Sequence, residues 1–154
     1  FCVQGLLNDH VAFYHKMTNN GGEWFYKHEF ETQKAIVDLF KTLPIMLEVE
    51  RKGGKFGFVH ADLPYQDWEL CKECLIQGDT LEGRDFKDHL IWSRGIVDKG
   101  VPINIAQIDN VFFGHTVLPK VTQLGNCTFL DTGGVFKKYD NGYELSIVNL
   151  DDYV

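Results

Sequence analysis

The 154-residue sequence carries 15 Lys and Arg against 22 Asp and Glu, which gives a formal net charge of −7 at pH 7. This acidic balance argues against nucleic acid or an anionic membrane surface as the main partner, because both repel negative charge. With 44% hydrophobic and 14% aromatic residues, the composition is that of a globular protein rather than a disordered one. The length suits a single domain with its own core.

Neither the apolar runs nor the cysteines predict a membrane protein or an oxidising compartment. No apolar run reaches the ~20 residues of a membrane span, and no signal peptide opens the chain. Cys71 and Cys74 form a CxxC pair, but no second CxxC or nearby histidine pair completes a zinc site. Helical spacing could put both thiols on one apolar face. We therefore expect ordinary reduced thiols and a cytoplasmic protein.

The first elements in the chain are predicted to be the end of a strand and then two helices. The sequence begins with Phe1 rather than Met, in an apparent strand, so we interpret it as incomplete on its N-terminal side. A short helix is predicted within residues 8–17, where Asn or Asp can supply the N-cap. A second helix is predicted from an N-cap at Thr32 to about Leu43, and Pro44 ends it.

A hairpin follows, and its second strand ends in polar residues. Ile45–Glu50 alternates as a half-buried strand does, and Gly53-Gly54 supplies the turn. The segment Lys55–Pro64 (KFGFVHADLP) reads as a short buried strand that stops at His60-Ala61-Asp62, since Pro64 forbids continuation. A histidine and a carboxylate are therefore expected at the tip of a rigid element, where sheets usually present chemistry.

The rest of the chain predicts a mixed sheet with a few helices. The expected elements are a surface loop with a short helix over Tyr65–Glu73, a helix over Asp85–Trp92 with Arg94 just past its end, and strands at Val111–Phe113, Val121–Leu124, Cys127–Leu130 and Tyr143–Val148. Asn141-Gly142 is a hairpin signal before the last strand. Together these elements predict an α/β (α+β) fold.

A second histidine also follows directly after a predicted strand. Asn110–Pro119 (NVFFGHTVLP) is an apolar run, then Gly114-His115-Thr116, then a proline. One such histidine alone is more simply explained as a hydrogen-bonded structural residue. Two of them, each followed by a turn, favour metal ligation, because neutral imidazole is a preferred ligand of borderline divalent metals. His60 and His115 are therefore the predicted metal ligands.

The ordered motifs HAD and GHT, with Ile91–Arg94 between them and Leu130–Gly134 after them, resemble the calcineurin-like metallophosphoesterases. The nearest resemblance is to the bacterial and phage lambda type of serine/threonine protein phosphatase, and it runs from about Asn19 to the C-terminus. It implies a metallophosphatase-type β-sandwich flanked by helices. Residues 1–154 would form one such domain, of which this chain supplies the C-terminal portion.

The resemblance also implies a reaction. Enzymes of this family hydrolyse phosphoesters with a binuclear metal centre and a metal-bound hydroxide, here with Mn²⁺ as the expected metal. The substrate would be a phosphorylated protein, through serine/threonine or dual specificity, or a small phosphomonoester. By resemblance, His60 and His115 would ligate one metal, and Arg94 would bind the substrate phosphate with its fork of donors. Asp62 is expected either to orient an imidazole or to cap the local turn.

Several motifs of the family do not occur in the sequence. The patterns Gly-Asp-x-His, Gly-Asp-x-x-Asp-Arg-Gly and Gly-Asn-His-Glu, which supply the remaining metal ligands, are all absent from it. We therefore predict that the 154 residues alone are inactive. Two alternatives stay open: a dinucleotide-polyphosphate hydrolase of the same fold, and a catalytically inactive remnant that serves as an interaction module.

Overall fold

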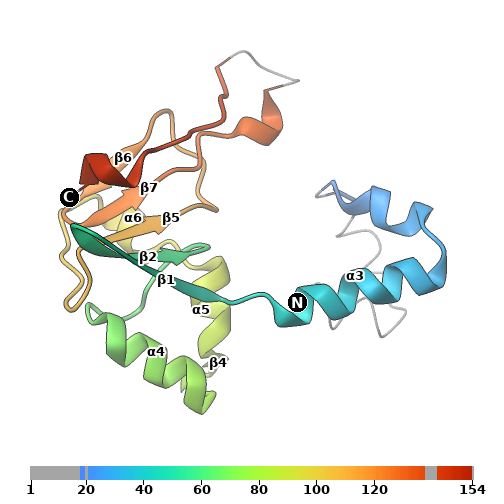
Figure 1. The fold of residues 1–154 in the computed structure, drawn as a ribbon, viewed down its shortest axis with the longest axis horizontal. Helices are drawn as coiled ribbons and strands as arrows, with labels where there is room; N and C mark the ends of the chain where they lie inside the picture. The colour runs from blue at the N-terminus through green and yellow to red at the C-terminus, as the bar shows by residue number, and fades with distance from the viewer. Residues whose placement is uncertain (1–17, 20, 138–141, 154) are drawn as a thin grey trace. The chain divides into compact units, whose positions relative to one another are not determined.

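The computed structural model describes residues 18–19, 21–137 and 142–153. The chain divides after Pro44 into two compact units, Phe1–Pro44 and Ile45–Val154 (Figure 1). The strand expected at Phe1 and the helix expected within residues 8–17 lie outside the described residues. In the described part of the chain, no helix combines the length and the apolar character needed to cross a membrane.

The described part of the first unit is helical. It contains the 3-10 helix η1 (Gly22–Lys27) and the α-helix α3 (Phe30–Thr42). The predicted N-cap at Thr32 is wrong, because the helix begins earlier and its N-cap is Glu29. The Glu29 side chain makes no capping hydrogen bond, whereas the Gln33 amide Nε2 donates to the His28 carbonyl at 2.7 Å. A side chain inside the first turn thus contacts the backbone just before the helix.

The second unit is built on a five-stranded mixed sheet in the order β1-β2-β5-β7-β6 (Figure 1). The strands are β1 (Met46–Arg51), β2 (Gly54–Val59), β5 (Asn110–Phe113), β6 (Thr122–Leu124) and β7 (Cys127–Phe129). The three central strands β2, β5 and β7 run parallel, while β1 and β6 pair antiparallel at the two edges. The predicted β1–β2 hairpin and the α/β class are confirmed.

Helices and short elements connect these strands. They are α4 (Trp68–Gln77), β3 (Thr80–Leu81), β4 (Arg84–Asp85), α5 (Phe86–Trp92), α6 (Gly95–Lys99), η2 (Gly134–Phe136) and η3 (Leu150–Tyr153). Asp67 caps α4 by accepting from the Leu70 N–H, and Asp85 caps α5 by accepting from the Lys87 N–H. The helix predicted to end at Trp92 is confirmed, and α4 extends past the short helix that was expected.

The last predicted strand, Tyr143–Val148, does not form. Only Glu144 makes a bridge, with Gly133. The Thr132 hydroxyl donates to the Glu144 carbonyl at 2.6 Å and also lies 2.6 Å from the Ser146 hydroxyl. Side-chain hydrogen bonds here take the place of a strand ladder, as Ser and Thr allow.

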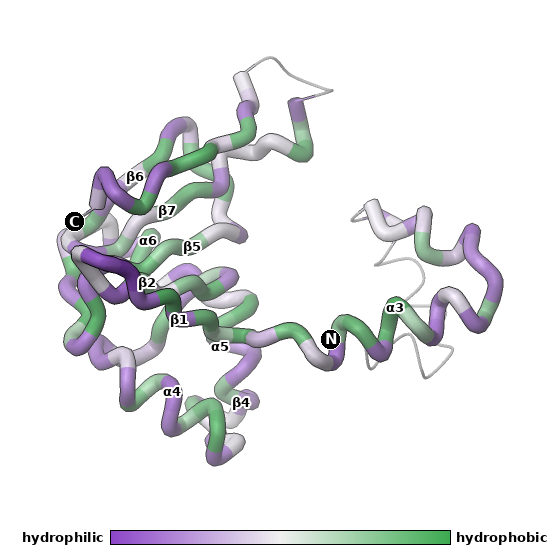
Figure 2. Tube along the Cα trace, in the orientation of Figure 1, coloured by the Kyte–Doolittle hydropathy of each residue, from purple (hydrophilic) through white to green (hydrophobic). Residues whose placement is uncertain are grey.

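The helices α4, α5 and α6 pack against one face of the sheet. The shared core joins Val59, Val111, Phe113, Cys127 and Phe129 from the strands to Trp68, Cys71, Cys74, Phe86, Leu90 and Ile96 from the helices. The central strands β5 and β7 are mostly hydrophobic along their length (Figure 2) and buried throughout. Parallel strands that are covered on both faces have this composition.

Trp68 is the largest side chain in this core and is fully buried. Its ring packs on Gly57, where an added Cβ would lie 2.6 Å from two ring carbons. Its indole Nε1 donates to a carboxylate oxygen of Glu48 at 2.5 Å. The apolar body of Trp68 is thus buried against the sheet, and its polar Nε1 reaches the rim of the core, where Glu48 lies.

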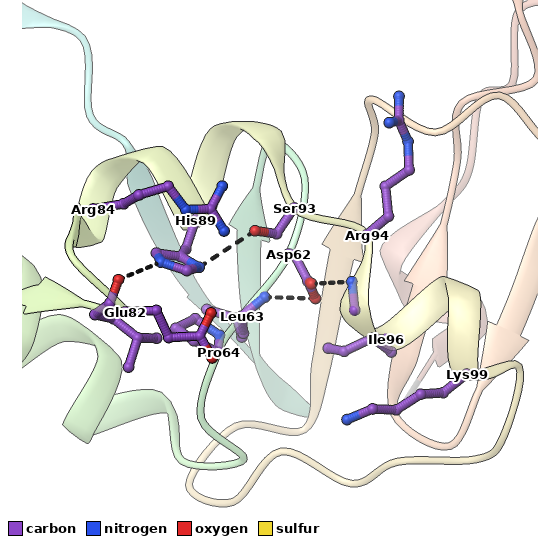
Figure 3. A pocket seen from close by; sticks show the side chains of 12 residues that line it. Asp62, Leu63, Pro64, Glu82, Arg84, His89, Ser93, Arg94, Ile96 and Lys99 are labelled. Carbon is purple, nitrogen blue, oxygen red and sulfur yellow. Dashed lines mark hydrogen bonds between the residues drawn. The ribbon is translucent and has the colours of Figure 1, made fainter.

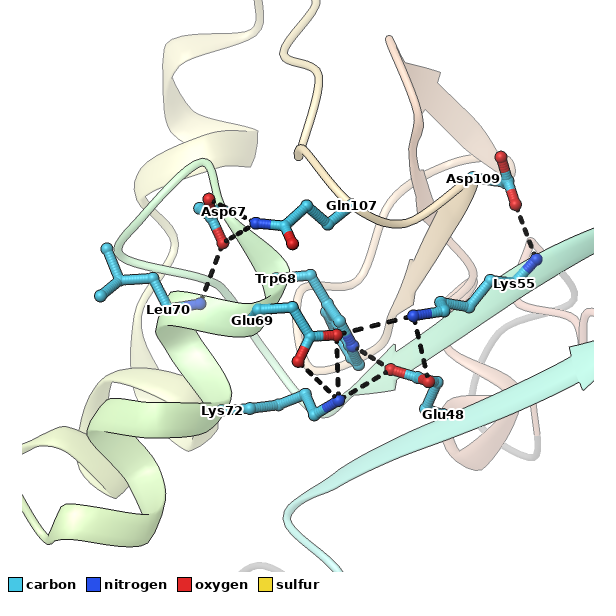
Figure 4. Close-up of polar contacts among 9 residues, drawn as sticks. All are labelled: Glu48, Lys55, Asp67, Trp68, Glu69, Leu70, Lys72, Gln107 and Asp109. Atoms are coloured by element: carbon cyan, nitrogen blue, oxygen red, sulfur yellow. Dashed lines mark hydrogen bonds and ion pairs between the residues drawn. The ribbon is translucent and has the colours of Figure 1, made fainter.

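Four charged side chains surround that rim and join α4 to the β1–β2 hairpin (Figure 4). Glu48 lies 3.4 Å from the Lys55 ammonium and 3.1 Å from that of Lys72. Glu69 lies 2.9 Å from Lys72 and 3.6 Å from Lys55. Because each carboxylate contacts both ammonium groups, the network fixes the register of the helix on the hairpin.

Candidate active site

Two of the parallel strands end side by side, and each end carries a histidine. Val59 of β2 pairs with Phe113 of β5, so both strands finish at the same level. The Gly114 N–H then donates to the His60 carbonyl at 2.9 Å, which continues the pairing for one more step. Carboxyl ends of parallel strands are where open α/β sheets bind ligands. The structure therefore brings His60 and His115 together at this edge.

The two imidazole rings lie edge to face with centroids 5.0 Å apart. The Trp92 ring lies 5.6 Å from that of His115 and covers it from the helix side. The Nε2 atom of His115 is buried and has no hydrogen-bond partner within the described ranges. A backbone hydrogen bond to Trp92 involves the same imidazole. Metal-binding histidines commonly use one ring nitrogen for a protein carbonyl and the other for the metal.

The backbone of His115 is held in an uncommon conformation. Its φ is 63°, in the left-handed region that side-chain-bearing residues rarely adopt. The turn around it is tight, because the Thr116 N–H donates to the Gly114 carbonyl at 2.7 Å. Strained residues of this kind cluster at ligand sites, where the surrounding structure imposes them. The turn aims the His115 ring at His60 at a cost in backbone energy.

Desolvation favours the neutral form of both imidazoles, although His60 is exposed and His115 is only partly buried. It lowers the pKa of His60, and the negative charge of Asp131 acts in the opposite direction. It also lowers the pKa of His115, to which the nearby His60 and Arg94 contribute further. A histidine whose pKa falls below its usual value of about 6.5 is neutral at pH 7. Neutral imidazole is the form that binds metal ions.

Arg94 reaches the same edge from the helix side. It is the N-cap residue of α6, and its Nε donates to the Thr116 hydroxyl at 3.2 Å. Among the residues that the structure describes, the guanidinium makes no other hydrogen bond or ion pair. Its terminal nitrogens are therefore available to an anion next to His115.

Asp62 is buried, and its carboxylate accepts hydrogen bonds from backbone N–H groups rather than from an imidazole. One oxygen accepts from the Leu63 N–H at 2.9 Å and the other from the Gly95 N–H at 2.5 Å (Figure 3). Burial raises the pKa of this carboxyl group, while the backbone donors act to lower it. Of the two roles that the sequence left open, these contacts match capping. Asp62 thereby ties the loop after His60 to the residue after Arg94.

A cavity of about 420 Å³ lies beside Asp62, and His89 and Arg94 also line it (Figure 3). His89 of α5 is buried at its wall, with ring nitrogens 3.0 Å from the Leu81 carbonyl and 3.4 Å from the Ser93 hydroxyl. Both ring nitrogens have protein partners, so this histidine is structural.

The buried cysteines do not contribute donors. Cys71, Cys74 and Cys127 are free and buried. Burial raises the pKa of the Cys71 thiol to about 11 and that of the Cys127 thiol to about 12, and it also raises that of Cys74. These thiols are protonated at neutral pH, whereas metals bind thiolates. The expected placement of Cys71 and Cys74 on one apolar face of a helix is confirmed.

The donor set at the strand edge fits part of a metal site. His115 offers a buried, unpartnered nitrogen, and His60 lies beside it. Within the described part of the chain, no group of three or more His, Cys, Asp or Glu side chains is placed to hold a metal ion. The two imidazoles would therefore need donors from outside the described residues.

Sequence reasoning missed one carboxylate at this edge. Asp131 comes two residues after the end of β7, and the sequence offered it only as part of the Leu130–Gly134 motif that carries the resemblance. In the structure its charge acts on both His60 and His115. The signal in the sequence was a third strand followed at once by a polar residue, but the pairing of β5 with β7 is needed to interpret it.

No protein-family model matches the chain. The chain is similar to serine/threonine-protein phosphatase 2 of Escherichia coli, with 27% identity over 120 residues that cover 74% of this chain and 50% of that protein. Serine/threonine-protein phosphatase 1 of Salmonella typhimurium is 30% identical over 121 residues, which cover 76% of this chain and 50% of that protein. The chain thus spans about half the length of the curated relatives it matches. Over about three quarters of its own length, the chain is therefore similar to proteins named as bacterial serine/threonine-protein phosphatases.

Proposed function

We propose that this chain supplies the C-terminal part of the active site of a metal-dependent serine/threonine protein phosphatase. The observation that carries the proposal is the pair of imidazoles 5.0 Å apart at the carboxyl edge of the sheet, one with a buried nitrogen that has no protein partner. The names of the relatives support the reaction class. The substrate would be a phosphorylated protein or a small phosphomonoester.

Each residue would have a distinct task. His60 and His115 would hold one metal ion, and the left-handed turn at His115 would fix the direction of its ring. Arg94 would bind and orient the phosphoryl group, with the Thr116 hydroxyl holding its Nε. Asp62 would keep the loops of His60 and Arg94 at a constant separation. When bound, the metal would supply Lewis-acid stabilisation of the phosphoryl oxygens and activation of water.

Mn²⁺ is the metal we propose for the complete site, in a binuclear arrangement. This ion lies low in the affinity order of divalent metals and prefers oxygen ligands, so two imidazoles alone would bind it weakly. Carboxylate and amide donors are therefore required beyond His60 and His115. Under this proposal, those donors belong to sequence that the relatives have and this chain does not span.

The ligand count predicts no phosphatase activity for the 154 residues alone. With added Mn²⁺, their hydrolysis of para-nitrophenyl phosphate should not exceed background. A polypeptide extended upstream to the length of the relatives should turn the substrate over. If the short chain matches the rate of the long one, the proposed ligands are wrong. If neither is active, the interaction-module alternative is favoured.

Arg94 provides a second prediction, to be measured in the extended protein. Replacing it with Ala should raise KM roughly tenfold, which corresponds to a loss of about 1.4 kcal/mol of phosphate binding. Arg94→Lys should not restore KM fully, because a point charge lacks the bidentate fork. Steady-state kinetics with an aryl phosphate measure both variants. An unchanged KM in Arg94→Ala would show that the arginine does not bind the substrate.

A further inference from the structure

The cavity beside Asp62 adjoins the candidate active site through Arg94. This arginine is one of the residues that line the cavity (Figure 3), and its Nε donates to the Thr116 hydroxyl, in the loop after His115, at 3.2 Å. The cavity volume of about 420 Å³ falls within the range of about 300–1,000 Å³ that is typical of small-ligand pockets. A group that occupies the cavity would therefore lie next to a phosphate held by Arg94.

Buried side chains hold two walls of this cavity in place. On the side of the β3–β4 hairpin, the ring of the buried His89 lies 3.0 Å from the Leu81 carbonyl, which fastens the hairpin to α5. On the side of α6, the buried Asp62 carboxylate accepts from the Gly95 N–H at 2.5 Å, at the first residue of that helix. The cavity thus lies between two elements that the core fixes.

Each of these walls carries a cation. Arg84 of β4 lines one wall and Lys99 of α6 the other (Figure 3), and neither makes an ion pair with a described carboxylate. Together with Arg94, they face two carboxylates in the lining, those of Asp62 and Glu82. Both oxygens of Asp62 already accept backbone N–H groups. The lining therefore has an excess of positive charge, in a chain whose net charge is −7.

We propose that this cavity is a subsite for an acidic side chain of the substrate, next to the phosphorylated residue. The inference rests on the proposed function, because the subsite is defined by its position beside a phosphate bound to Arg94. Carboxylates form charge-assisted hydrogen bonds with guanidinium and ammonium groups, which Arg84 and Lys99 supply here from two sides. The substrates favoured by this site are phosphopeptides with Asp or Glu beside the phosphorylated residue.

The alternative is that Arg84 and Lys99 are ordinary solvated surface charges. Arg84→Gln and Lys99→Gln test it, because each removes one charge and leaves a side chain that can still donate a hydrogen bond. Glu82→Gln changes the charge of the lining in the opposite direction. Lys52→Gln is the matched control, because Lys52 is exposed in the turn between β1 and β2 and is not part of the lining.

The experiment uses the extended protein and two phosphoserine peptides that differ only in the flanking residues, Glu in one and Gln in the other. The unmodified protein should have a higher kcat/KM for the Glu peptide. Arg84→Gln and Lys99→Gln should each lower that value roughly 2- to 5-fold, as expected for loss of one exposed ion pair, and should not change it for the Gln peptide. Glu82→Gln should raise kcat/KM for the Glu peptide, and Lys52→Gln should leave it unchanged.

Para-nitrophenyl phosphate, which has no flanking residues, distinguishes failure of the inference from failure of the proposed function. If the extended protein hydrolyses it but does not prefer the Glu peptide, the inference is overturned and the function stands. An equal loss of preference in Lys52→Gln would also overturn the inference, because net charge would then explain the effect.

If the extended protein is inactive, binding of a fluorescent Glu peptide to the 154-residue chain decides the question. Fluorescence anisotropy should then show weaker binding to Arg84→Gln and Lys99→Gln than to the unmodified chain, and tighter binding to Glu82→Gln. Equal binding to all four chains would overturn the inference.

Discussion

Removing His115 from the extended protein is expected to reduce both bound metal and kcat by roughly 100-fold or more, while the fold is retained. The reason is the Nε2 atom, which is buried and has no partner among the described residues, in a ring whose centroid lies 5.0 Å from that of His60. His115→Ala removes this donor without adding a group that could replace it. Elemental analysis of bound metal, measured beside circular dichroism, tests the expectation.

The backbone of His115 requires a control, because its φ is 63°. Alanine in the left-handed region retains the steric cost that glycine avoids. His115→Gly therefore separates loss of the ligand from strain in the turn: both variants should lose metal equally. His60→Ala should lose bound metal as His115→Ala does. The control His28→Ala, in the first unit, should bind as much metal as the unmodified protein. Full metal and normal turnover in His115→Gly would remove His115 from the site.

Trp68→Ala is expected to lower the free energy of unfolding by about 3–5 kcal/mol, the cost of deleting a large aromatic side chain from a core. Trp68 is fully buried between α4 and the sheet, and its Nε1 donates to Glu48. Because domains are stable by only about 5–15 kcal/mol, this loss should be plain in urea denaturation.

Gly57 gives a matched test of the same contact. A Cβ there would lie 2.6 Å from two carbons of the Trp68 ring, which is closer than packed atoms approach. Gly57→Ala should therefore destabilise the sheet in the same assay. The double variant with Trp68→Ala should show less than the sum of the two losses, because the small side chain frees the space. Additive losses would show that Trp68 does not pack on Gly57 in solution.

The local parts of the fold could be predicted from the sequence. The β1–β2 hairpin followed from alternation and its glycine turn, and α5 matches the helix expected over Asp85–Trp92, with Asp85 as its N-cap. The start of α3 and the absence of a strand at Tyr143–Val148 could not be predicted. At these places the Gln33 amide donates to the His28 carbonyl and the Thr132 hydroxyl to the Glu144 carbonyl, contacts that the local sequence pattern does not reveal.

The sequence predicts the strand ends that carry the site residues one by one, but not which strands lie next to one another. The sequence indicates that His60 and His115 each follow a strand. That β5 lies between β2 and β7 is a matter of sheet order, which local patterns do not encode. The same order places Asp131 level with His115. The hydrogen bond from the Gly95 N–H to Asp62 likewise joins residues far apart in the sequence. Long-range pairing therefore determines how these residues meet.

The central claim is that His60 and His115 together hold a metal ion, and Mn²⁺-induced broadening of imidazole NMR signals tests it most directly. Unpaired electrons of a bound Mn²⁺ broaden only nearby nuclei, so even a weak site is detected in the 154-residue chain. The account predicts that the signals of His60 and His115 broaden first and together, while those of His28 and His89 stay sharp. Uniform broadening of all the imidazole signals, or broadening of only one of the signals of His60 and His115, would contradict it.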